Sequence, residues 1–198
     1  LSFMAVGPSA RVTEQMRMHA PDAIVCAGFF EPELLNALRA SGKPLVLIDM
    51  KLRGYSSVNP DNHMGGYLAT RHLISLGRER IGMISGSLGH YSIRERNRGY
   101  RQALFEAGML ADPRLETCLP DGVDLETGAY EAMQSLLDQP HPPDAVFCYN
   151  DAAALVAMRA CLAAGKTVPH DISIVGFDDI PGAVLGHRPL TTLRINKK

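Results

Sequence analysis

Short apolar runs alternate with longer stretches of helical periodicity along most of this chain. The apolar runs are bounded by polar residues and are rich in Ile and Val, which is typical of strands buried on both faces of a parallel sheet. Several helical stretches are followed by a glycine that can cap them. The expected strands lie at 1–6, 23–27, 44–48, 81–85, 145–149 and 171–177, with an extended segment at 190–195. The expected helices lie at 13–19, 31–41, 65–76, 96–107, 129–137 and 152–164.

The alternation of strand and helix continues from residue 23 to residue 177, which predicts a doubly wound α/β fold. A strand, a helix and a second strand joined by short links form a parallel crossover unit. Two blocks of this construction flank residues 56–60, which are expected to be a short extended connector. We therefore expect two Rossmann-like parallel-sheet lobes. They are an N-terminal lobe at 1–58, a C-terminal lobe at 59–189 and a crossover strand at 190–198 that returns to the N-terminal lobe.

Composition narrows the class of protein. The 198 residues include 20 Lys and Arg against 21 Asp and Glu, so these residues lack the basic excess with which proteins bind duplex DNA. No apolar run is long enough for a membrane span, and the N-terminus lacks the order of an export signal. The four cysteines and seven histidines show no spacing of a disulfide framework or metal site. We expect no metal, no cofactor and a reducing cytoplasm.

Polar side chains follow several of the expected strands. Open parallel sheets bind ligands at the carboxyl ends of their strands, so Asp178, at the end of the 171–177 strand, is a candidate binding residue. Carboxylates and amides bind hydroxyl groups, and aromatic rings cover apolar faces of a ligand. Arg96, expected in the first turn of its helix, brings a planar guanidinium to the same edge. The residues at these strand ends are Gly28, Phe29, Phe30, Asp49, Ser85, Gly86, Asn150, Asp151, Phe177 and Asp178.

Several of these polar residues also have a purely structural interpretation. Asp151 occupies the expected N-cap of a helix, and capping alone explains it. Asp179 precedes Pro181 and can be a turn residue, as can Asp49. Arg94 and Arg101 fit a solvated basic helix face.

Sequence signatures of enzymes are missing. The chain has no Gly-x-Ser-x-Gly elbow, no phosphate-binding Gly-x-x-x-x-Gly-Lys and no Gly-x-Gly-x-x-Gly after a strand. The adjacent Asp178 and Asp179 could suggest an acid–base pair, but neighbours at a strand end usually point apart. We therefore interpret the chain as a binding protein and do not expect it to be an enzyme.

A set of motifs in one order resembles a known family. The motifs are Val58-x-x-Asp61-Asn62-x-x-Gly65-Gly66, His72-Leu73, Ile84-Ser85-Gly86, Arg96-x-x-Gly99-Tyr100, Asn150-Asp151, Val168-Pro169-x-Asp171-Ile172-Ser173, Val175-Gly176-Phe177-Asp178-Asp179 and Pro189-Leu190-Thr191-Thr192. With these motifs the chain resembles, from about residue 23 to residue 194, the effector-binding core of lactose-repressor/galactose-repressor (LacI/GalR) type transcription regulators.

The resemblance implies a periplasmic-binding-protein-like fold with an effector cleft between two lobes, and a homodimer that responds to a sugar or a purine. It also implies contact residues by position. Those that match polar effector contacts are Asp49, Ser92, Arg96, Asn150 and Asp178. Tyr149 and Phe177 are placed at the pocket wall. Asp124 falls near a ring-stacking aromatic of some relatives, a role that its acidity does not suit, and Asp61-Asn62 is interpreted as mainly structural.

The expected function is the effector-sensing domain of a DNA-binding regulator, usually a repressor. Operator DNA would be bound only through an N-terminal helix-turn-helix headpiece that is not part of this sequence. The first strand and helix of the N-terminal lobe and the last elements after Lys198 are also expected to be missing. The alternative is a periplasmic solute-binding protein that delivers sugar to a transporter, which shares the fold.

Overall fold

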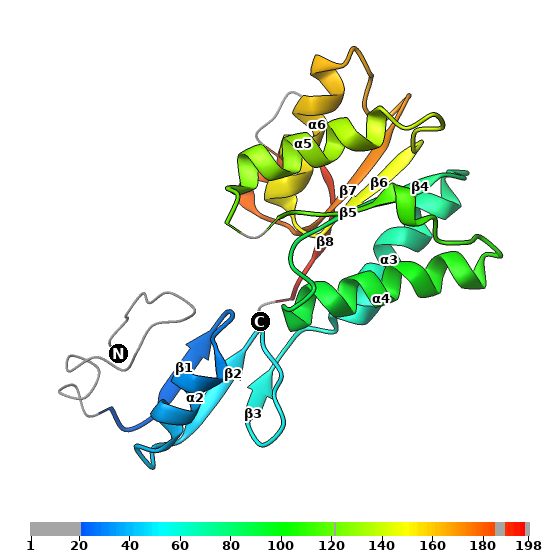
Figure 1. The fold of residues 1–198 in the computed structure, drawn as a ribbon. Helices are drawn as coiled ribbons and strands as arrows, with labels where there is room; N and C mark the ends of the chain where they lie inside the picture. Colours follow the sequence, from blue (N-terminus) through cyan, green and yellow to red (C-terminus); the bar gives the residue numbers. More distant parts are fainter. Residues whose placement is uncertain (1–20, 121, 185–188, 197–198) are drawn as a thin grey trace. The chain divides into compact units, whose positions relative to one another are not determined.

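The computed structural model describes residues 21–120, 122–184 and 189–196. The strand expected at 1–6 and the helix expected at 13–19 lie outside the described residues. The chain divides between Pro60 and Asp61 into two compact units, each with its own parallel sheet (Figure 1). This division falls close to the lobe boundary expected after residue 58.

The first unit contains a three-stranded parallel sheet of order β1-β2-β3. Its elements are β1 (Ile24–Ala27), α2 (Pro32–Arg39), β2 (Leu45–Ile48) and β3 (Ser56–Val58). Helix α2 begins with Pro32, whose fixed φ suits the first helical turn. The core of this unit is formed by Cys26, Leu35, Leu47 and Met50.

The prediction of a connector at 56–60 is partly wrong, because the first three of these residues form strand β3. Ser56 and Ser57 are polar, so the segment lacks the apolar signal of a strand. Backbone hydrogen bonds to β2 need no apolar side chain, and they pair Ser57 with Leu47 and Val58 with Ile48.

The second unit contains a five-stranded parallel sheet of order β5-β4-β6-β7-β8. Its strands are β4 (Ile81–Ser85), β5 (Glu116–Cys118), β6 (Ala145–Cys148), β7 (Ser173–Asp178) and β8 (Thr191–Arg194). The sequence did not predict β5, because this edge strand is short and polar. The segment expected to return to the N-terminal lobe contributes β8, which pairs with β7 in this sheet. The return of the chain to the N-terminal lobe after β8 stays a prediction.

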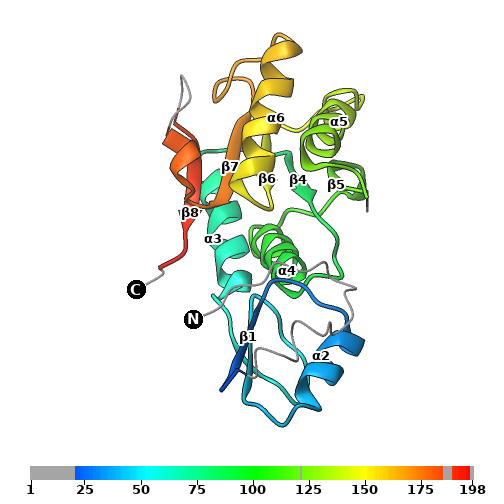
Figure 2. The same cartoon turned by 90° about the vertical axis from the view of Figure 1, so that its left-hand side faces the viewer.

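Helices cover both faces of this sheet (Figures 1 and 2). They are α3 (Asn62–Ser75), α4 (Tyr91–Glu106), α5 (Leu125–Leu137) and α6 (Asp151–Ala163), with short 3-10 turns at Pro113–Leu115 and Pro181–Val184. In β6, Ala145 and Phe147 pack in the core with α3 and α4, whereas Val146 and Cys148 pack in the core with α5 and α6. This burial on both faces confirms the predicted α/β fold with parallel sheets.

Three helices begin at least three residues earlier than the sequence predicted, because polar residues and glycines in their first turns interrupt the apolar period. Helix α4 begins at Tyr91, so Arg96 lies in its second turn and the prediction of a first-turn arginine is wrong. Helix α5 has Asp124 as its N-cap, and α3 has Asp61. The N-cap of α6 is Asn150, so the interpretation of Asp151 as the cap is also wrong.

Two glycines bring α3 and α4 into close contact. A Cβ atom on Gly66 would lie 2.1 Å from the carbonyl oxygen of Arg96, and one on Gly99 would lie 2.0 Å from the carbonyl oxygen of His63. Neither glycine has room for a side chain. The two helix backbones therefore meet beside Arg96 and fix the point from which its side chain projects.

Candidate ligand-binding site

Strand β7 ends in a pair of aspartates with unusual backbone conformation. Asp178 has φ of 106° and Asp179 has φ of 54°, and Asp49, at the end of β2, has φ of 61°. These are the non-glycine residues with positive φ in the described ranges. Aspartate tolerates this region better than most residues, but it still costs free energy that the surrounding structure must offset. Such positions occur often at binding sites.

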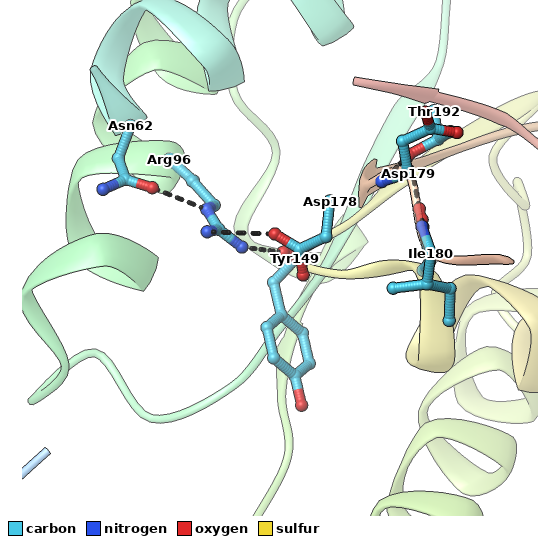
Figure 3. A network of polar contacts seen from close by, with 8 residues as sticks. Asn62, Arg96, Tyr149, Asp178, Asp179, Ile180 and Thr192 are labelled. Atoms are coloured by element: carbon cyan, nitrogen blue, oxygen red, sulfur yellow. Dashed lines mark hydrogen bonds and ion pairs between the residues drawn. The ribbon is translucent and has the colours of Figure 1, made fainter. Parts of the chain in front are cut away.

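The side chain of Arg96 connects three elements at the carboxyl edge of the second sheet (Figure 3). Its Nε donates to Oδ1 of Asn62 across 3.0 Å, and Nη1 donates to the carbonyl oxygen of Tyr149 across 2.6 Å. Its Nη2 lies 3.5 Å from Oδ1 of Asp178. Arg96 is only 5% exposed, so these contacts replace the water that a guanidinium would otherwise bind. The planar fork is thereby held in one orientation.

Phe177 lies under this guanidinium. The Cζ atom of Arg96 is 3.7 Å from the centroid of the Phe177 ring, which is a cation–π contact. The ring is 1% exposed, and a Cβ on Gly65 would lie 2.5 Å from its Cε2 atom. Phe177 therefore supports Arg96 from the core, and its predicted place at a pocket wall stays a prediction.

Three further predicted residues lie at the same edge of the second unit. Tyr149 and Asn150 follow β6, and Ser92 lies one helical turn before Arg96 on α4. Burial raises the pKa of the Tyr149 phenol, so the hydroxyl remains a hydrogen-bond donor at neutral pH. The side-chain oxygen of Asn150 accepts from the backbone N–H of Ala153 across 2.8 Å and so caps α6.

Asp49 belongs to the first unit. It is exposed, it follows β2, and its backbone N–H lies 3.4 Å from the carbonyl oxygen of Val58. Within the second unit, the structure brings Arg96, Tyr149, Phe177 and Asp178 into contact. A ligand shared by these residues and Asp49 stays a prediction.

Other polar residues have structural roles. The carboxylate of Asp124 accepts from the backbone N–H of Thr127 across 3.0 Å, and this hydrogen bond is the largest cause of its lowered pKa. Asp179 pairs with Arg194 on β8, while Arg101 pairs with Glu116 at 2.6 Å. Arg94 is exposed, as predicted for a solvated face.

The sequence does not reveal the partner of Asn62. The structural role expected for Asn62 takes a specific form, because its 2% exposed side chain holds Arg96. The only signal in the sequence is its place in the motif with Asp61, which does not identify a partner far along the chain.

Within the described residues, no group of three His, Cys, Asp or Glu side chains is placed to hold a metal ion. Nor does any described helix have the length and apolar character needed to cross a membrane. The fold is that of an α/β protein with two parallel-sheet units, a class in which the carboxyl edge of the sheet commonly binds small molecules.

Residues 70–198 match the model of the periplasmic binding protein-like domain, and the chain belongs to this family. The HTH-type transcriptional repressor PurR of Haemophilus influenzae (strain PittEE) is 37% identical over 175 residues, which cover 88% of this chain and 51% of the repressor. The chain thus spans about half the length of the curated relatives it matches.

Solved structures give the same result. The transcriptional regulator CelR in complex with cellobiose is similar with a TM-score of 0.80 and 33% identity, over 87% of this chain and 54% of CelR. The transcription regulator CcpA of Lactococcus lactis has a TM-score of 0.81 and 27% identity, over 90% of this chain and 65% of CcpA. A sugar-binding transcriptional regulator of the LacI family from Escherichia coli has a TM-score of 0.77 and 27% identity, over 90% of this chain and 65% of the regulator. The resemblance to LacI-type regulators is therefore confirmed.

Proposed function

We propose that this chain is the effector-sensing domain of a DNA-binding transcription regulator, usually a repressor, whose operator affinity changes when a small molecule binds. The observation that carries the proposal is the Arg96–Asp178 pair at the carboxyl edge of the second sheet, where parallel α/β proteins bind ligands. The similarity to regulators of transcription supports the same function.

The proposed effector contacts are Asp49, Ser92, Arg96, Tyr149, Asn150, Phe177 and Asp178. The charges of Arg96 and Asp178 offset each other, and Asp49 adds a carboxylate, so the proposed contacts offer hydrogen-bond donors and acceptors without an excess of positive charge. Such a site favours a neutral molecule with hydroxyl or amide groups over an anion. A sugar or a purine base has these groups, and cellobiose, with which CelR was solved, is a neutral sugar of this kind.

The proposed partners follow from the same class. Regulators that bind paired half-sites are commonly homodimers. The formal charge of −1 gives this chain no basic excess for DNA binding, so operator binding is assigned to a headpiece outside these residues. A cytoplasmic location is expected for a protein that acts on operators. Effector binding would alter DNA affinity only as far as it discriminates between two arrangements of the protein.

The experiment is a thermal-shift panel on the chain. It contains neutral sugars including cellobiose, sugar acids, phosphorylated sugars and purine bases. A ligand at a hundred times its Kd stabilises the native state by about 2.7 kcal/mol, which raises Tm by several degrees. A shift with a neutral sugar or purine, lost in Asp178→Asn, supports the proposal. A shift that survives unchanged in Asp178→Asn would place the ligand elsewhere.

A further inference from the structure

The carboxylate of Asp151 is fully buried at the start of α6, with 0% of the residue exposed. Its Oδ2 accepts from the backbone N–H of Ile180 across 2.9 Å, and its Oδ1 accepts from the hydroxyl of Thr192 on β8. Asn150 already caps the helix, so capping does not account for Asp151. A buried carboxylate is costly unless it is hydrogen-bonded, and these two hydrogen bonds tie α6 to residues around the end of β7.

Gly176 shows how closely this carboxylate is fitted. A Cβ atom on Gly176 would lie 2.2 Å from Oδ1 of Asp151, so the carboxylate occupies the space in which any other residue would place its side chain. Thr192 lies opposite Gly176 in the register of β7 and β8. The hydroxyl of Thr192 therefore reaches Asp151 across a position that only glycine leaves open.

These hydrogen bonds hold residues 178–180, which include two residues with an unfavourable backbone conformation. Asp178 and Asp179 have positive φ in succession, and the next residue, Ile180, donates its N–H to Asp151. The N–H of Asp179 lies 3.4 Å from Oγ1 of Thr192 (Figure 3), and the Asp179 carboxylate pairs with Arg194. Consecutive residues in a sparsely populated region persist only when surrounding contacts fix them.

We propose that Asp151 and Thr192 are positioning residues of the ligand site: their buried hydrogen bonds hold the left-handed turn that directs the Asp178 carboxylate toward Arg96. This inference rests on the proposed function, because it assigns Asp178 to ligand contact. Neither Asp151 nor Thr192 touches the ligand; both act through the conformation of residues 178–180.

Two variants of Thr192 and one control distinguish the effect of the hydroxyl group from the effect of side-chain size. Thr192→Val removes the hydroxyl and keeps the size, whereas Thr192→Ser keeps the hydroxyl and removes a methyl group. Thr191→Val is the matched control, because Thr191 is the exposed neighbour on β8 and its side chain points to the other face.

The first readout needs no ligand. Amide hydrogen exchange followed by NMR should show a protected Ile180 N–H in the wild-type chain, in Thr192→Ser and in Thr191→Val. In Thr192→Val the same amide should exchange at least tenfold faster, and the Nε–H signal of Arg96 should shift. An Ile180 amide that exchanges freely in the wild-type chain overturns the proposal without any variant, even if Thr192→Val does not fold. Loss of protection in Thr192→Ser but not in Thr192→Val would also overturn it, because bulk would then be the cause.

The second readout is affinity for cellobiose, gluconate and hypoxanthine by calorimetric titration. The probe that binds the wild-type chain should bind Thr192→Val at least tenfold more weakly and Thr192→Ser about equally. Unchanged affinity in Thr192→Val, together with faster Ile180 exchange, would refute a role in positioning the site. If the exchange pattern is as expected and none of the probes binds, the hydrogen bonds stand and the proposed function is the part that fails.

Discussion

Oδ1 of Asn62 accepts a hydrogen bond from Nε of Arg96 across 3.0 Å and so joins the first turn of α3 to the second turn of α4. Asn62 is the second residue after the division between the two units at Pro60. Asn59, on the other side of that division, donates to the carbonyl oxygen of Met50 across 3.2 Å. The connector is thus anchored on each side by an asparagine, and one of the two holds a proposed effector contact.

The first prediction concerns this anchor. Asn62→Leu removes the acceptor and leaves the buried Nε–H of Arg96 without it, which should lower the free energy of unfolding by about 1–3 kcal/mol. A guanidinium that has lost this contact should also bind the stabilising compound of the panel at least tenfold more weakly. Asn62→Asp keeps an acceptor of the same size and should retain more of both properties than Asn62→Leu. Urea unfolding and calorimetric titration measure the two effects, and equal behaviour of Leu and Asp at this position would refute the role.

The second prediction separates binding from stability at the ion pair. Asp178→Asn keeps the shape, and Asp178 is 31% exposed in its side chain, so the change in unfolding free energy should stay within about 1 kcal/mol. Ligand affinity should nevertheless fall at least tenfold, because the carboxylate can no longer accept in the same way. Wild-type affinity in this variant would remove Asp178 from the site.

The second prediction extends to Arg96, the other member of the ion pair. This residue needs a milder substitution than alanine, because it is buried and packs on Phe177. Arg96→Lys keeps the charge and loses the planar fork, so we expect weaker binding with a folded chain. Arg98→Lys, on the exposed side of the same helix, is its control and should bind like the wild-type chain.

Much of the fold could be predicted from the sequence, because buried parallel strands are continuous apolar runs and their pattern is local. The strands β4, β6 and β7 were found in this way. The three-residue strands β3 and β5 were not, because backbone pairing at a sheet edge leaves no apolar pattern. The strand ends and the family motifs both indicated Arg96 and Asp178 as binding residues. Their side chains lie 3.5 Å apart, and their role in ligand binding stays a prediction.

What the sequence could not supply depends on contacts between distant residues. Asn150 and Asp151 are both good N-cap residues, and the choice between them is a shift of one residue in the start of α6. One helical residue is a rotation of about 100°, so that shift decides whether Asp151 faces solvent or the buried end of β7. The partner that settles it, Thr192, lies 41 residues further along the chain.

The third prediction concerns the glycine contacts between α3 and α4. Gly99→Ala would place a Cβ against the His63 carbonyl, so the helices must separate, and we expect a loss of at least about 1–3 kcal/mol of unfolding free energy. Gly66→Ala should act similarly and also displace Arg96. Gly89→Ala is the control, since it meets no atom closer than 3.5 Å. An equal fall in Tm in Gly89→Ala and in the other two variants would contradict this close packing.

The fourth prediction follows from hydrogen-bonded carboxylates at caps and turns. The backbone N–H of Thr127 lowers the pKa of Asp124, and the hydroxyl of Thr167 is the largest cause of the lowered pKa of Asp171. A carboxyl group with a lowered folded-state pKa stabilises the native state above its ordinary value of 3.8 and loses that contribution as the pH falls through the lower value. Tm should therefore decline below about pH 4.

Asp124→Asn tests the contribution of one such group, because asparagine also caps a helix but does not titrate in this range. Its Tm should fall less steeply than that of the wild-type chain between pH 4 and pH 2, while the two curves run parallel between pH 6 and pH 8. Asp138→Asn, at the C-cap of the same helix, carries no such N-cap bond and should follow the wild-type curve. A wild-type slope in Asp124→Asn would mean that the Thr127 hydrogen bond adds nothing to stability in acid.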